Sequence, residues 1–274
     1  MSQIKVACVQ MRSGTDVARN IADASALIRQ AAGHGAELIA TPEMTTLLDR
    51  RPGAVWEKST TEDADPGLRA FRALAKDLGV TLLIGSIAIR AGNNKCANRS
   101  FLIGPDGGVL ASYDKIHMFD VQLNAGNVYR ESDSFAAGDR PVTVAIPVAT
   151  LGLTICYDIR FPDLYRTLAI SGASIITVPA AFTRITGDAH WHILIRSRAI
   201  ETGCFIIAPA QGGRHDDGRE TYGHSLIVDP WGEILAESGI DPGVITATLD
   251  LARVGEVRGK IPSLQHARTL RPSS

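Results

Sequence analysis

Apolar residues in the first third of the chain follow two spacings, one typical of strands and the other of helices. A β-rich run covers residues 4–10, apolar residues at helical spacing cover 21–32, and a short apolar run follows at 38–40. A second helical stripe over 68–78 leads into another β-rich run over 81–87. Strands that alternate with helices in this way predict an α/β fold.

The pattern changes over residues 98–115, where two apolar runs flank the sequence Pro105-Asp106-Gly107-Gly108. Proline and glycine suit a tight turn between antiparallel strands, so this segment is expected to form a hairpin. A hairpin joined to strands that alternate with helices predicts a sheet with both parallel and antiparallel pairs.

The second half of the chain repeats this plan and also ends in a hairpin. Strands are expected over 142–146, 151–155 and 174–179, with helices after Pro162 and near 188–202. The sequence PDGGVLA in the first hairpin shares four positions with PWGEILA in the second. Two sheets with helices on one face each would bury their bare faces against one another. The sequence therefore predicts a four-layer αββα sandwich with two mixed β-sheets packed face to face.

Size and charge point to one large domain that acts on a small molecule. The chain has 274 residues, 45% of them hydrophobic and 21% charged, and contains no Pro/Gly/Ser-rich linker. We expect a single domain over residues 1–270 and a tail over 271–274. The net charge of -1 provides no broad basic field for nucleic acid or an anionic membrane. Without a signal peptide or an apolar run of about 18 residues, a cytoplasmic location is expected.

The four cysteines, Cys8, Cys96, Cys156 and Cys204, lie far apart in the sequence. They form no CxxC pair and show no regular spacing, which argues against a disulfide framework and against a structural zinc site. Cys8 and Cys204 stand inside apolar runs, where cysteine usually acts as a small buried hydrophobic residue. At most one of the four is expected to be chemically special.

Three polar residues each follow an apolar strand, where the ligand sites of α/β sheets gather. Glu43 follows AELIA, Lys115 ends the second strand of the first hairpin, and Cys156 follows LGLTI. Cys156 also precedes the helix start at Pro162 and lies close to Arg160, a setting whose positive potential favours thiolate. Taken singly, each residue has a plain alternative, as a buried core cysteine or as a solvated surface charge.

Taken together, the three residues stand in motifs that identify a family. The chain resembles the nitrilase superfamily of carbon-nitrogen hydrolases over nearly its whole length, through PEM, YDKIHMFDV and CYDIRFP, which contain Glu43, Lys115 and Cys156 in the family's order. The resemblance implies that Glu43 takes the thiol proton, Cys156 attacks a carbonyl carbon and Lys115 stabilises the tetrahedral intermediate. The backbone amide of Tyr157 would be a second donor to the oxyanion, and Glu43 would then activate water against the thioester.

The resemblance extends to a fourth residue and to assembly. Glu131 in YRES matches the position where relatives carry an additional active-site carboxylate, although a loop salt bridge with Arg130 is the alternative interpretation. The family implies neither a metal nor an organic cofactor. It also implies a homodimer or a higher homo-oligomer, and the helix with Arg196, Arg198 and Glu201 is a reasonable interface.

Within the superfamily, the segments QGGRH, TYGHS and YRES are most similar to the deaminated glutathione amidases, with the omega-amidases as close relatives. This resemblance implies hydrolysis of deaminated glutathione to 2-oxoglutarate and Cys-Gly, or of 2-oxoglutaramate as the alternative. Because such substrates carry an α-keto acid, the pocket should hold a cation, and Arg160 is the first candidate. An ion pair of Arg160 with Asp158 or Asp163 is equally open. Further candidate substrate contacts are Tyr157, Phe182, Thr183 and Arg214.

Other functions fit the residues less well. Ser225 in GHSLI is similar to the start of G-x-S-x-G, but Ile227 stands where a glycine must permit the sharp turn. No GxGxxG or GxxxxGK motif indicates a nucleotide site. In HWH, His190 and His192 would lie on different faces of a helix, which predicts packing rather than a metal site. A nitrilase would use the same three residues, and a catalytically idle binding protein on this fold is the alternative from another class.

Overall fold

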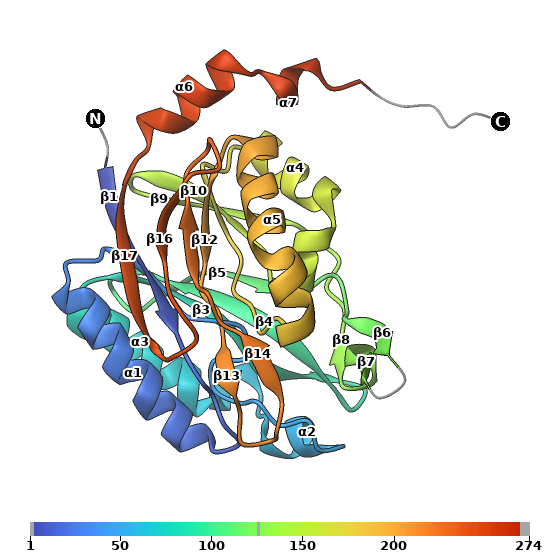
Figure 1. The fold of residues 1–274 in the computed structure, drawn as a ribbon. Coiled ribbons are helices and arrows are strands. Elements are labelled where there is room, and N and C mark those ends of the chain that lie inside the picture. Colours follow the sequence, from blue (N-terminus) through green and yellow to red (C-terminus); the bar gives the residue numbers. More distant parts are fainter. Residues whose placement is uncertain (1–2, 125–126, 269–274) are drawn as a thin grey trace.

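The structure of the chain is a computed structural model that describes residues 3–124 and 127–268. Two large β-sheets pack face to face, and helices cover the outer face of each sheet (Figure 1). The predicted α/β class and the four-layer αββα sandwich are therefore confirmed. The predicted tail over 271–274 lies outside the described residues.

Both sheets are mixed, as the hairpins predicted. The first has seven strands in the order β17-β1-β2-β3-β4-β5, with β8 paired to β4. These are β1 (Gln3–Gln10), β2 (Leu38–Ala40), β3 (Thr81–Gly92), β4 (Lys95–Ile103), β5 (Val109–Asp114), β8 (Phe135–Ala136) and β17 (Gly243–Asp250). The second has six strands in the order β16-β15-β12-β11-β10-β9. These are β9 (Val142–Ile146), β10 (Ala149–Leu153), β11 (Ile175–Thr177), β12 (Phe205–Ala208), β15 (Leu226–Val228) and β16 (Ile234–Glu237).

Two small ribbons lie outside the large sheets. One pairs β6 (Asp120–Asn124) with β7 (Asn127–Arg130), and the other pairs β13 (Gly212–Arg214) with β14 (Glu220–Tyr222). The ribbon of β13 and β14 was not expected from the apolar pattern, because it is short and largely polar. The strand β7 carries Val128, Tyr129 and Arg130, which line the candidate site described below, and Arg219 directly before β14 lines it as well.

The long helices begin at side chains that cap them. α1 (Val17–Gly33) and α3 (Pro66–Leu78) cover the first sheet, and α4 (Pro162–Ile170) and α5 (Arg184–Thr202) cover the second (Figure 1). The side chains that cap α1, α3 and α5 accept hydrogen bonds from backbone amides of the first turn, and they belong to Asp16, Asp65 and Thr183 respectively. Because of these caps, α1 and α5 start four residues earlier than predicted. The shorter elements are α2 (Ala54–Lys58), α6 (Ala252–Lys260), α7 (Ser263–His266), and the 3-10 turns η1 (Glu62–Ala64), η2 (Glu131–Asp133) and η3 (Cys156–Arg160).

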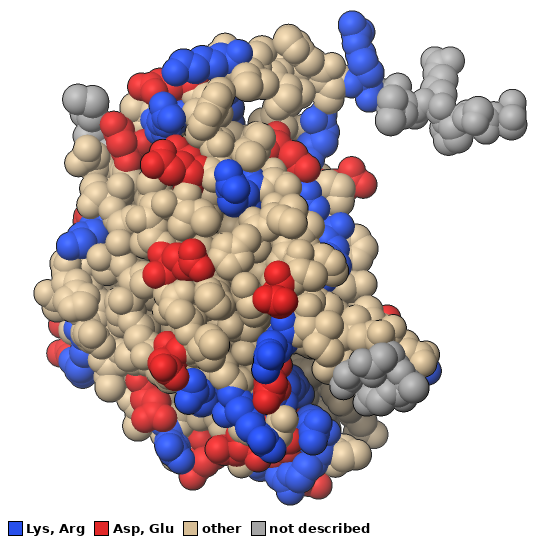
Figure 2. Space-filling model, viewed as in Figure 1, with Lys and Arg blue, Asp and Glu red and all other residues tan. Residues whose placement is uncertain are grey.

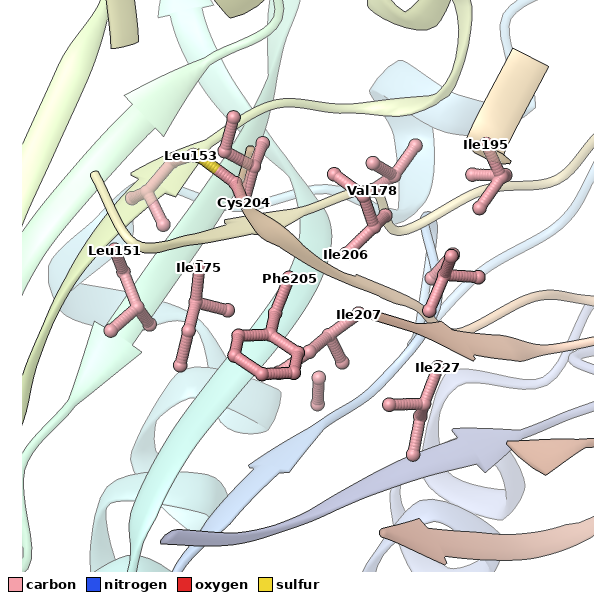
Figure 3. Packing of buried hydrophobic residues seen from close by; sticks show 14 of the residues in the cluster. Leu151, Leu153, Ile175, Val178, Ile195, Cys204, Phe205, Ile206, Ile207 and Ile227 are labelled. Atoms are coloured by element: carbon pink, nitrogen blue, oxygen red, sulfur yellow. The ribbon is translucent and has the colours of Figure 1, made fainter. Parts of the chain in front are cut away.

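Alternating strand residues fill two cores. In β1, Val6 and Cys8 pack in the cluster between the two sheets, whereas Ala7 and Val9 pack with α1 and α3. Figure 3 shows the side chains that the second sheet and its surroundings contribute, including Leu153, Phe205 and Ile207. Cys8 and Cys204 are fully buried in the first of these cores, as their apolar neighbours predicted.

The C-terminal strand departs from the plan of one sheet for each half of the chain. β17 pairs antiparallel with β1 from Gln3 opposite Asp250 to Gln10 opposite Gly243, so it completes the sheet of the first half. The physical reason is that β1 would otherwise expose an unpaired edge at a strand whose side chains are largely buried. The two sheets are therefore tied together by the chain itself.

The surface carries both signs of charge. Figure 2 shows Lys and Arg interspersed with Asp and Glu on the face drawn there, rather than one broad basic area. Within the described ranges, no helix combines the length and the apolar character that a membrane span requires. All four cysteines are free and buried in the part of the chain that the structure describes.

Candidate active site

Four predicted residues meet in one cavity of about 280 Å³, which Glu43, Lys115, Glu131 and Cys156 all line. Glu43 lies in the turn after β2, Lys115 directly follows β5, Glu131 begins η2, and Cys156 begins η3 after β10. The cavity thus lies where both sheets end, and each sheet supplies part of it. Sequence positions as far apart as 43 and 156 are brought together only by the packing of the two sheets.

The Glu43 carboxylate is buried and bound on both oxygens. Its Oε1 accepts hydrogen bonds from Lys115 Nζ and from Asn98 Nδ2, each at 2.9 Å, and its Oε2 accepts one from the backbone N–H of Ala181 at 2.9 Å. Strand β3 holds the turn that carries Glu43, because Ser86 binds the backbone amides of Met44 and Thr45. These contacts fix the position of the carboxylate before any substrate enters.

Lys115 lies between two carboxylates and is only 2% exposed. Its Nζ donates to Glu43 Oε1 at 2.9 Å and to both oxygens of Glu131, at 2.9 and 2.8 Å. Burial on its own would lower the pKa of Lys115, but Glu131 and Glu43 raise it well above the usual value. The side chain is therefore a fixed ammonium ion at neutral pH.

Glu131 belongs to the site rather than to a loop salt bridge with Arg130. Besides Lys115, its carboxylate accepts hydrogen bonds from the backbone N–H of Phe119 at 2.7 Å and from Asn98 Nδ2 at 3.1 Å. Among the described residues, its side chain has an ion pair with Lys115 alone. Its position is consistent with a carboxylate that orients the lysine.

Asn98 is a part of the site that sequence reasoning missed. It is 1% exposed, and its Nδ2 donates to both Glu43 and Glu131. Its Oδ1 is buried without a hydrogen-bond partner in the described parts of the chain. The one signal in the sequence was an asparagine at the start of an expected strand, since asparagine is usually disfavoured in strands.

Cys156 has an unusual backbone conformation. Its φ of 50° lies in the left-handed region, and its N–H donates to the carbonyl of Pro179 at 2.8 Å. A residue with a side chain adopts this conformation at a cost of about 1–3 kcal/mol, and such strain gathers at functional sites. The turn directs the chain from β10 into η3 while the thiol stays in the cavity.

The expectation of a resting thiolate at Cys156 is wrong. Burial and the Glu43 carboxylate hold the pKa of Cys156 well above its usual value, and the Lys115 ammonium opposes them only in part. Burial by itself would raise the pKa of Glu43 too, but Lys115 and the hydrogen bonds to the carboxylate lower it overall. The free site thus contains a carboxylate, which can accept a proton, beside a protonated thiol, which can donate one.

Asp158 fixes the turn that carries Cys156. Its carboxylate accepts hydrogen bonds from Tyr113 Oη at 2.7 Å and from the backbone amides of Ile155 and His117, at 2.9 and 3.1 Å. The ring of His117 lies 2.7 Å from the same carboxylate. These bonds occupy Asp158, so it is not the ion-pair partner of Arg160.

Three predicted substrate contacts line the cavity, and two do not. Tyr157, Phe182 and Thr183 belong to its wall, whereas Arg160 and Arg214 are absent from its described lining. The Arg160 guanidinium lies 5.9 and 5.4 Å from the ring centres of Tyr157 and Phe182 and contacts His190 Nδ1 at 3.2 Å. Arg160 therefore stands directly behind the wall, and Arg214 lies exposed at the end of β13.

The cavity lining also includes arginines that the sequence motifs did not indicate. Arg50, Arg51, Arg130 and Arg219 all belong to its lining. Arg51 forms two short contacts, of 3.0 and 2.6 Å, with the buried carboxylate of Asp49. Arg219 is held less tightly, because its ion-pair contact with Asp217 is 3.7 Å. The cavity therefore has a cationic rim in addition to the cluster of Glu43, Lys115, Glu131 and Cys156.

A buried thiol, a carboxylate and a fixed ammonium in one cavity define a class of enzyme. The thiol can attack a carbonyl carbon once the carboxylate removes its proton, and the ammonium can stabilise the oxyanion that forms. These groups suit a hydrolase that forms a covalent intermediate on cysteine.

Comparisons with known proteins agree with this chemistry. The family model for carbon-nitrogen hydrolases matches residues 5–259. A deaminated glutathione amidase of Synechocystis sp. is 42% identical over 272 residues, covering 97% of this chain and 98% of the relative. A deaminated glutathione amidase of Homo sapiens is 38% identical over 270 residues, covering 96% and 82%.

Solved structures give the same result for the fold. The NitFhit protein of C. elegans has a TM-score of 0.91 and 32% identity, and the match covers 98% of this chain but 66% of that longer one. Nit3 of Saccharomyces cerevisiae, described as a member of branch 10 of the nitrilase superfamily, has a TM-score of 0.85 and 28% identity over 95% of this chain and 94% of that chain. The chain belongs to the carbon-nitrogen hydrolase family, which confirms the resemblance seen in the motifs and the assignment as a carbon–nitrogen hydrolase.

Proposed function

We propose that this chain is an amidase that hydrolyses deaminated glutathione to 2-oxoglutarate and Cys-Gly through a thioester on Cys156. The observation that carries the proposal is the contact of Glu43 with Lys115 in the cavity that holds the thiol. The substrate is supported by the names of relatives that are 38–42% identical over nearly the full length of this chain. The cysteine is supported by a 26% identical amidase from Nesterenkonia sp., whose structure shows covalent addition at the active site cysteine.

The first half of the reaction transfers the acyl group to sulfur. Glu43 takes the thiol proton as Sγ of Cys156 attacks the amide carbonyl carbon, and the carbonyl oxygen becomes an oxyanion. Lys115 Nζ and the backbone N–H of Tyr157 donate hydrogen bonds to that oxyanion, each worth about 3 kcal/mol to the transition state. When the intermediate collapses, the C–N bond breaks, protonated Glu43 gives its proton to the leaving nitrogen, and Cys-Gly departs.

The second half returns the enzyme to its resting state. Glu43 takes a proton from water as the water attacks the thioester carbon, again through an oxyanion at the same donors. The S–C bond then breaks, 2-oxoglutarate leaves, and the Cys156 sulfur recovers the proton from Glu43. Glu131 keeps Lys115 aimed at the oxyanion throughout, since it binds Nζ with both oxygens.

The proposed substrate carries a carboxylate at each end, and the arginines around the cavity suit both. We assign the keto-acid end to the side of Tyr157 and Phe182, where Arg160 stands behind the wall. The glycine carboxylate of the leaving group then points to the rim with Arg130 and Arg219. Guanidinium groups bind carboxylates with two parallel hydrogen bonds, which suits the arginines at the rim. Arg160, from behind the wall, would attract the keto-acid end by its positive charge.

Intact-mass spectrometry tests the nucleophile and the substrate together. The wild-type chain and its Cys156→Ala variant are mixed briefly with deaminated glutathione and with 2-oxoglutaramate, and product release is followed in parallel. We expect an acyl adduct and faster turnover of deaminated glutathione in the wild type, and neither in the variant. Turnover that survives in Cys156→Ala would show that Cys156 is not the nucleophile.

The same experiment separates the alternatives. Faster turnover of 2-oxoglutaramate would indicate an omega-amidase, and ammonia release from a simple aliphatic nitrile alone would indicate a nitrilase. Equal and slow labelling of all four cysteines by iodoacetamide, with no turnover, would favour a catalytically idle binding protein.

Arg219 tests how the leaving group is recognised. Arg219→Gln should raise KM for deaminated glutathione at least about tenfold, because a charge-assisted hydrogen bond is worth about 1.5–3 kcal/mol. KM for 2-oxoglutaramate should stay unchanged, since that substrate has no glycine carboxylate. Arg184→Gln is a matched control, because Arg184 has a similar loose ion pair, 3.5 Å to Glu220, outside the described cavity lining. Equal effects on both substrates would contradict the assignment.

We also propose that the chain forms a homodimer through an apolar groove. The groove holds about 640 Å³ between α4, α5 and the C-terminal helices, and its lining includes Ile170, Ile200, Trp231 and Ile261, which are 49–61% exposed. The predicted contacts on α5 are engaged within the chain instead, because Arg198 binds Glu201 and Arg196 binds the carbonyl of Gly232. A second copy could cover the exposed apolar side chains.

Sedimentation velocity of the wild type and of Ile200→Glu tests the dimer. We expect a dimer that the variant converts to a monomer, whereas a monomeric wild type would overturn the proposal.

We further propose a cytoplasmic location, which the free cysteines and the proposed thiol nucleophile favour. Cell fractionation with an antibody to the chain tests the location.

A further inference from the structure

Two histidines and a glutamate meet at the surface, outside the described lining of the catalytic cavity. His192 Nε2 and His224 Nδ1 contact the same oxygen, Oε1 of Glu237, at 2.9 and 2.8 Å. One such atom from each residue lies within 4.8 Å of the other two. His192 comes from α5, His224 from the turn before β15, and Glu237 ends β16, so three separate elements supply the cluster.

We propose that His192, His224 and Glu237 bind a divalent transition-metal ion of the zinc type. Two imidazoles and a carboxylate form a donor set that zinc accepts, with water as the fourth ligand. Tetrahedral zinc with bonds of about 2.0–2.1 Å holds its ligand atoms about 3.3 Å apart. The two contacts to Glu237 would therefore have to lengthen by about 0.5 Å, which small side-chain rotations allow.

The backbone around His224 is held in advance. Its φ of 53° is in the left-handed region, its N–H donates to the carbonyl of Gly239 at 2.8 Å, and its carbonyl accepts from Trp191 Nε1 at 2.8 Å. The ring of Tyr222 stacks on the His224 ring with centroids 4.4 Å apart. These contacts hold His224 so that its Nδ1 faces Glu237, and none of them is a hydrogen bond to Nδ1 itself.

A metal at this place would join α5 to the hairpin of β15 and β16. The same helix is capped by Thr183 in the wall of the candidate cavity, and Trp191 contacts Phe182 of that wall with ring centroids 5.0 Å apart. We expect the ion to stabilise the fold, because a ligand that binds only the folded chain raises the melting temperature. The plain alternative is a metal-free cluster of hydrogen bonds.

Zinc titration by calorimetry at about pH 7.5 distinguishes a metal site from a metal-free cluster of hydrogen bonds. The proteins are the wild type, His192→Ala and His224→Asn, and asparagine is chosen because it tolerates the left-handed backbone. His34→Ala is the matched control for an exposed histidine, since His34 lies outside the cluster. Cys156→Ala is the second control, because a thiol can itself bind zinc. Amidase activity without added metal reports whether the cluster variants fold.

The expected result is one zinc ion in the wild type and in both controls. His192→Ala and His224→Asn should bind at least about 100-fold more weakly, since loss of an outer hydrogen-bond partner of a ligand alone costs about 10–100-fold. Zinc should raise the melting temperature of the wild type and of His34→Ala, but not of the two cluster variants. Wild-type protein without zinc binding, equal affinity in His192→Ala, or binding lost in Cys156→Ala would each overturn the proposal.

Discussion

At the scale of single residues, the candidate site depends on one ammonium between two carboxylates. Glu43 and Glu131 both bind Lys115, so the buried group carries one excess negative charge while Cys156 is protonated. A thiolate formed by loss of a proton to bulk water would add a second negative charge, which burial disfavours. Transfer of the proton from Cys156 to Glu43 leaves the total charge unchanged. The arrangement therefore favours internal proton transfer over a resting thiolate.

The pH dependence of the reaction follows from the direction of these shifts. Because the pKa of Glu43 is lowered, the acid limb of kcat/KM should lie below the ordinary glutamate value of about 4.3. Because the pKa of Lys115 is raised well above its usual value, loss of its charge should not limit the rate at about pH 9 or below. A pH profile of deaminated glutathione hydrolysis checks both statements. An acid limb near pH 6 would contradict them.

Asn98 offers a sharper test of the same balance. Asn98→Asp adds a negative charge beside Glu43 and removes the hydrogen bond that stabilises its carboxylate, and both changes raise the pKa of Glu43. The acid limb of kcat/KM should therefore move to higher pH, by more than in Asn98→Ala, which removes the donor alone. Circular dichroism of both variants controls for folding. Identical acid limbs in all three proteins would show that Asn98 does not set the ionisation of Glu43.

At the scale of elements, strand β3 supports the turn that presents Glu43, the proposed general base. Thr41 Oγ1 accepts a hydrogen bond from the Gly85 amide at 3.0 Å, and the carbonyl of Leu83 binds the Thr41 amide at 2.9 Å. A Cβ at Gly85 would lie 2.1 Å from the carbonyl oxygen of Thr41 and 2.4 Å from that of Pro42. The turn can approach β3 this closely only because residue 85 has no side chain.

Gly85→Ala should therefore damage the site more than the fold. Overpacking of this kind costs about 1–3 kcal/mol, while a displacement of about 1 Å at a catalytic group can reduce the rate about 100-fold. Urea unfolding and kcat/KM measure the two effects. Gly243→Ala in β17 is the matched control, because no atom lies within 4 Å of its added Cβ, and its stability should change by about 0.5 kcal/mol or less. Normal kcat/KM in Gly85→Ala would contradict the role of the close approach.

At the scale of the whole molecule, the C-terminal strand makes the two halves one structure. Leu249 of β17 is fully buried in the core between the sheets, opposite Ile4 of β1. The core thus includes residues from both ends of the chain. This arrangement is why we propose that residues 1–270 form one domain, which should unfold in one cooperative transition.

Leu249→Ala tests that proposal. The substitution should lower the free energy of unfolding by about 2–5 kcal/mol, as expected for a leucine removed from a closed core. Urea transitions followed by fluorescence and by circular dichroism should coincide in both the wild type and the variant. Thr248→Ala, at the exposed neighbouring position, should change stability little. Two separate transitions would show that the halves unfold independently.

The sequence by itself determined the layers, the main hairpins and the candidate residues for the chemistry. Periodicity is a local property, so alternation and helical spacing could be read directly. The motifs around Glu43, Lys115 and Cys156 are also local, and the family resemblance supplied their roles as proposals. None of these required knowledge of which segments are neighbours in space.

Only the tertiary structure decided what depends on contacts between distant segments. Asn98 meets Glu43 across 55 positions and Glu131 across 33, so a lone asparagine in a strand gave little indication of its place. The same holds for Arg219 at the rim of the cavity and for the pairing of β17 with β1. The protonation of Cys156 was misjudged for this reason too, because burial and the Glu43 charge exist only in the folded chain. Burial, charge proximity and strand neighbours are properties of the packed molecule, and a linear pattern does not contain them.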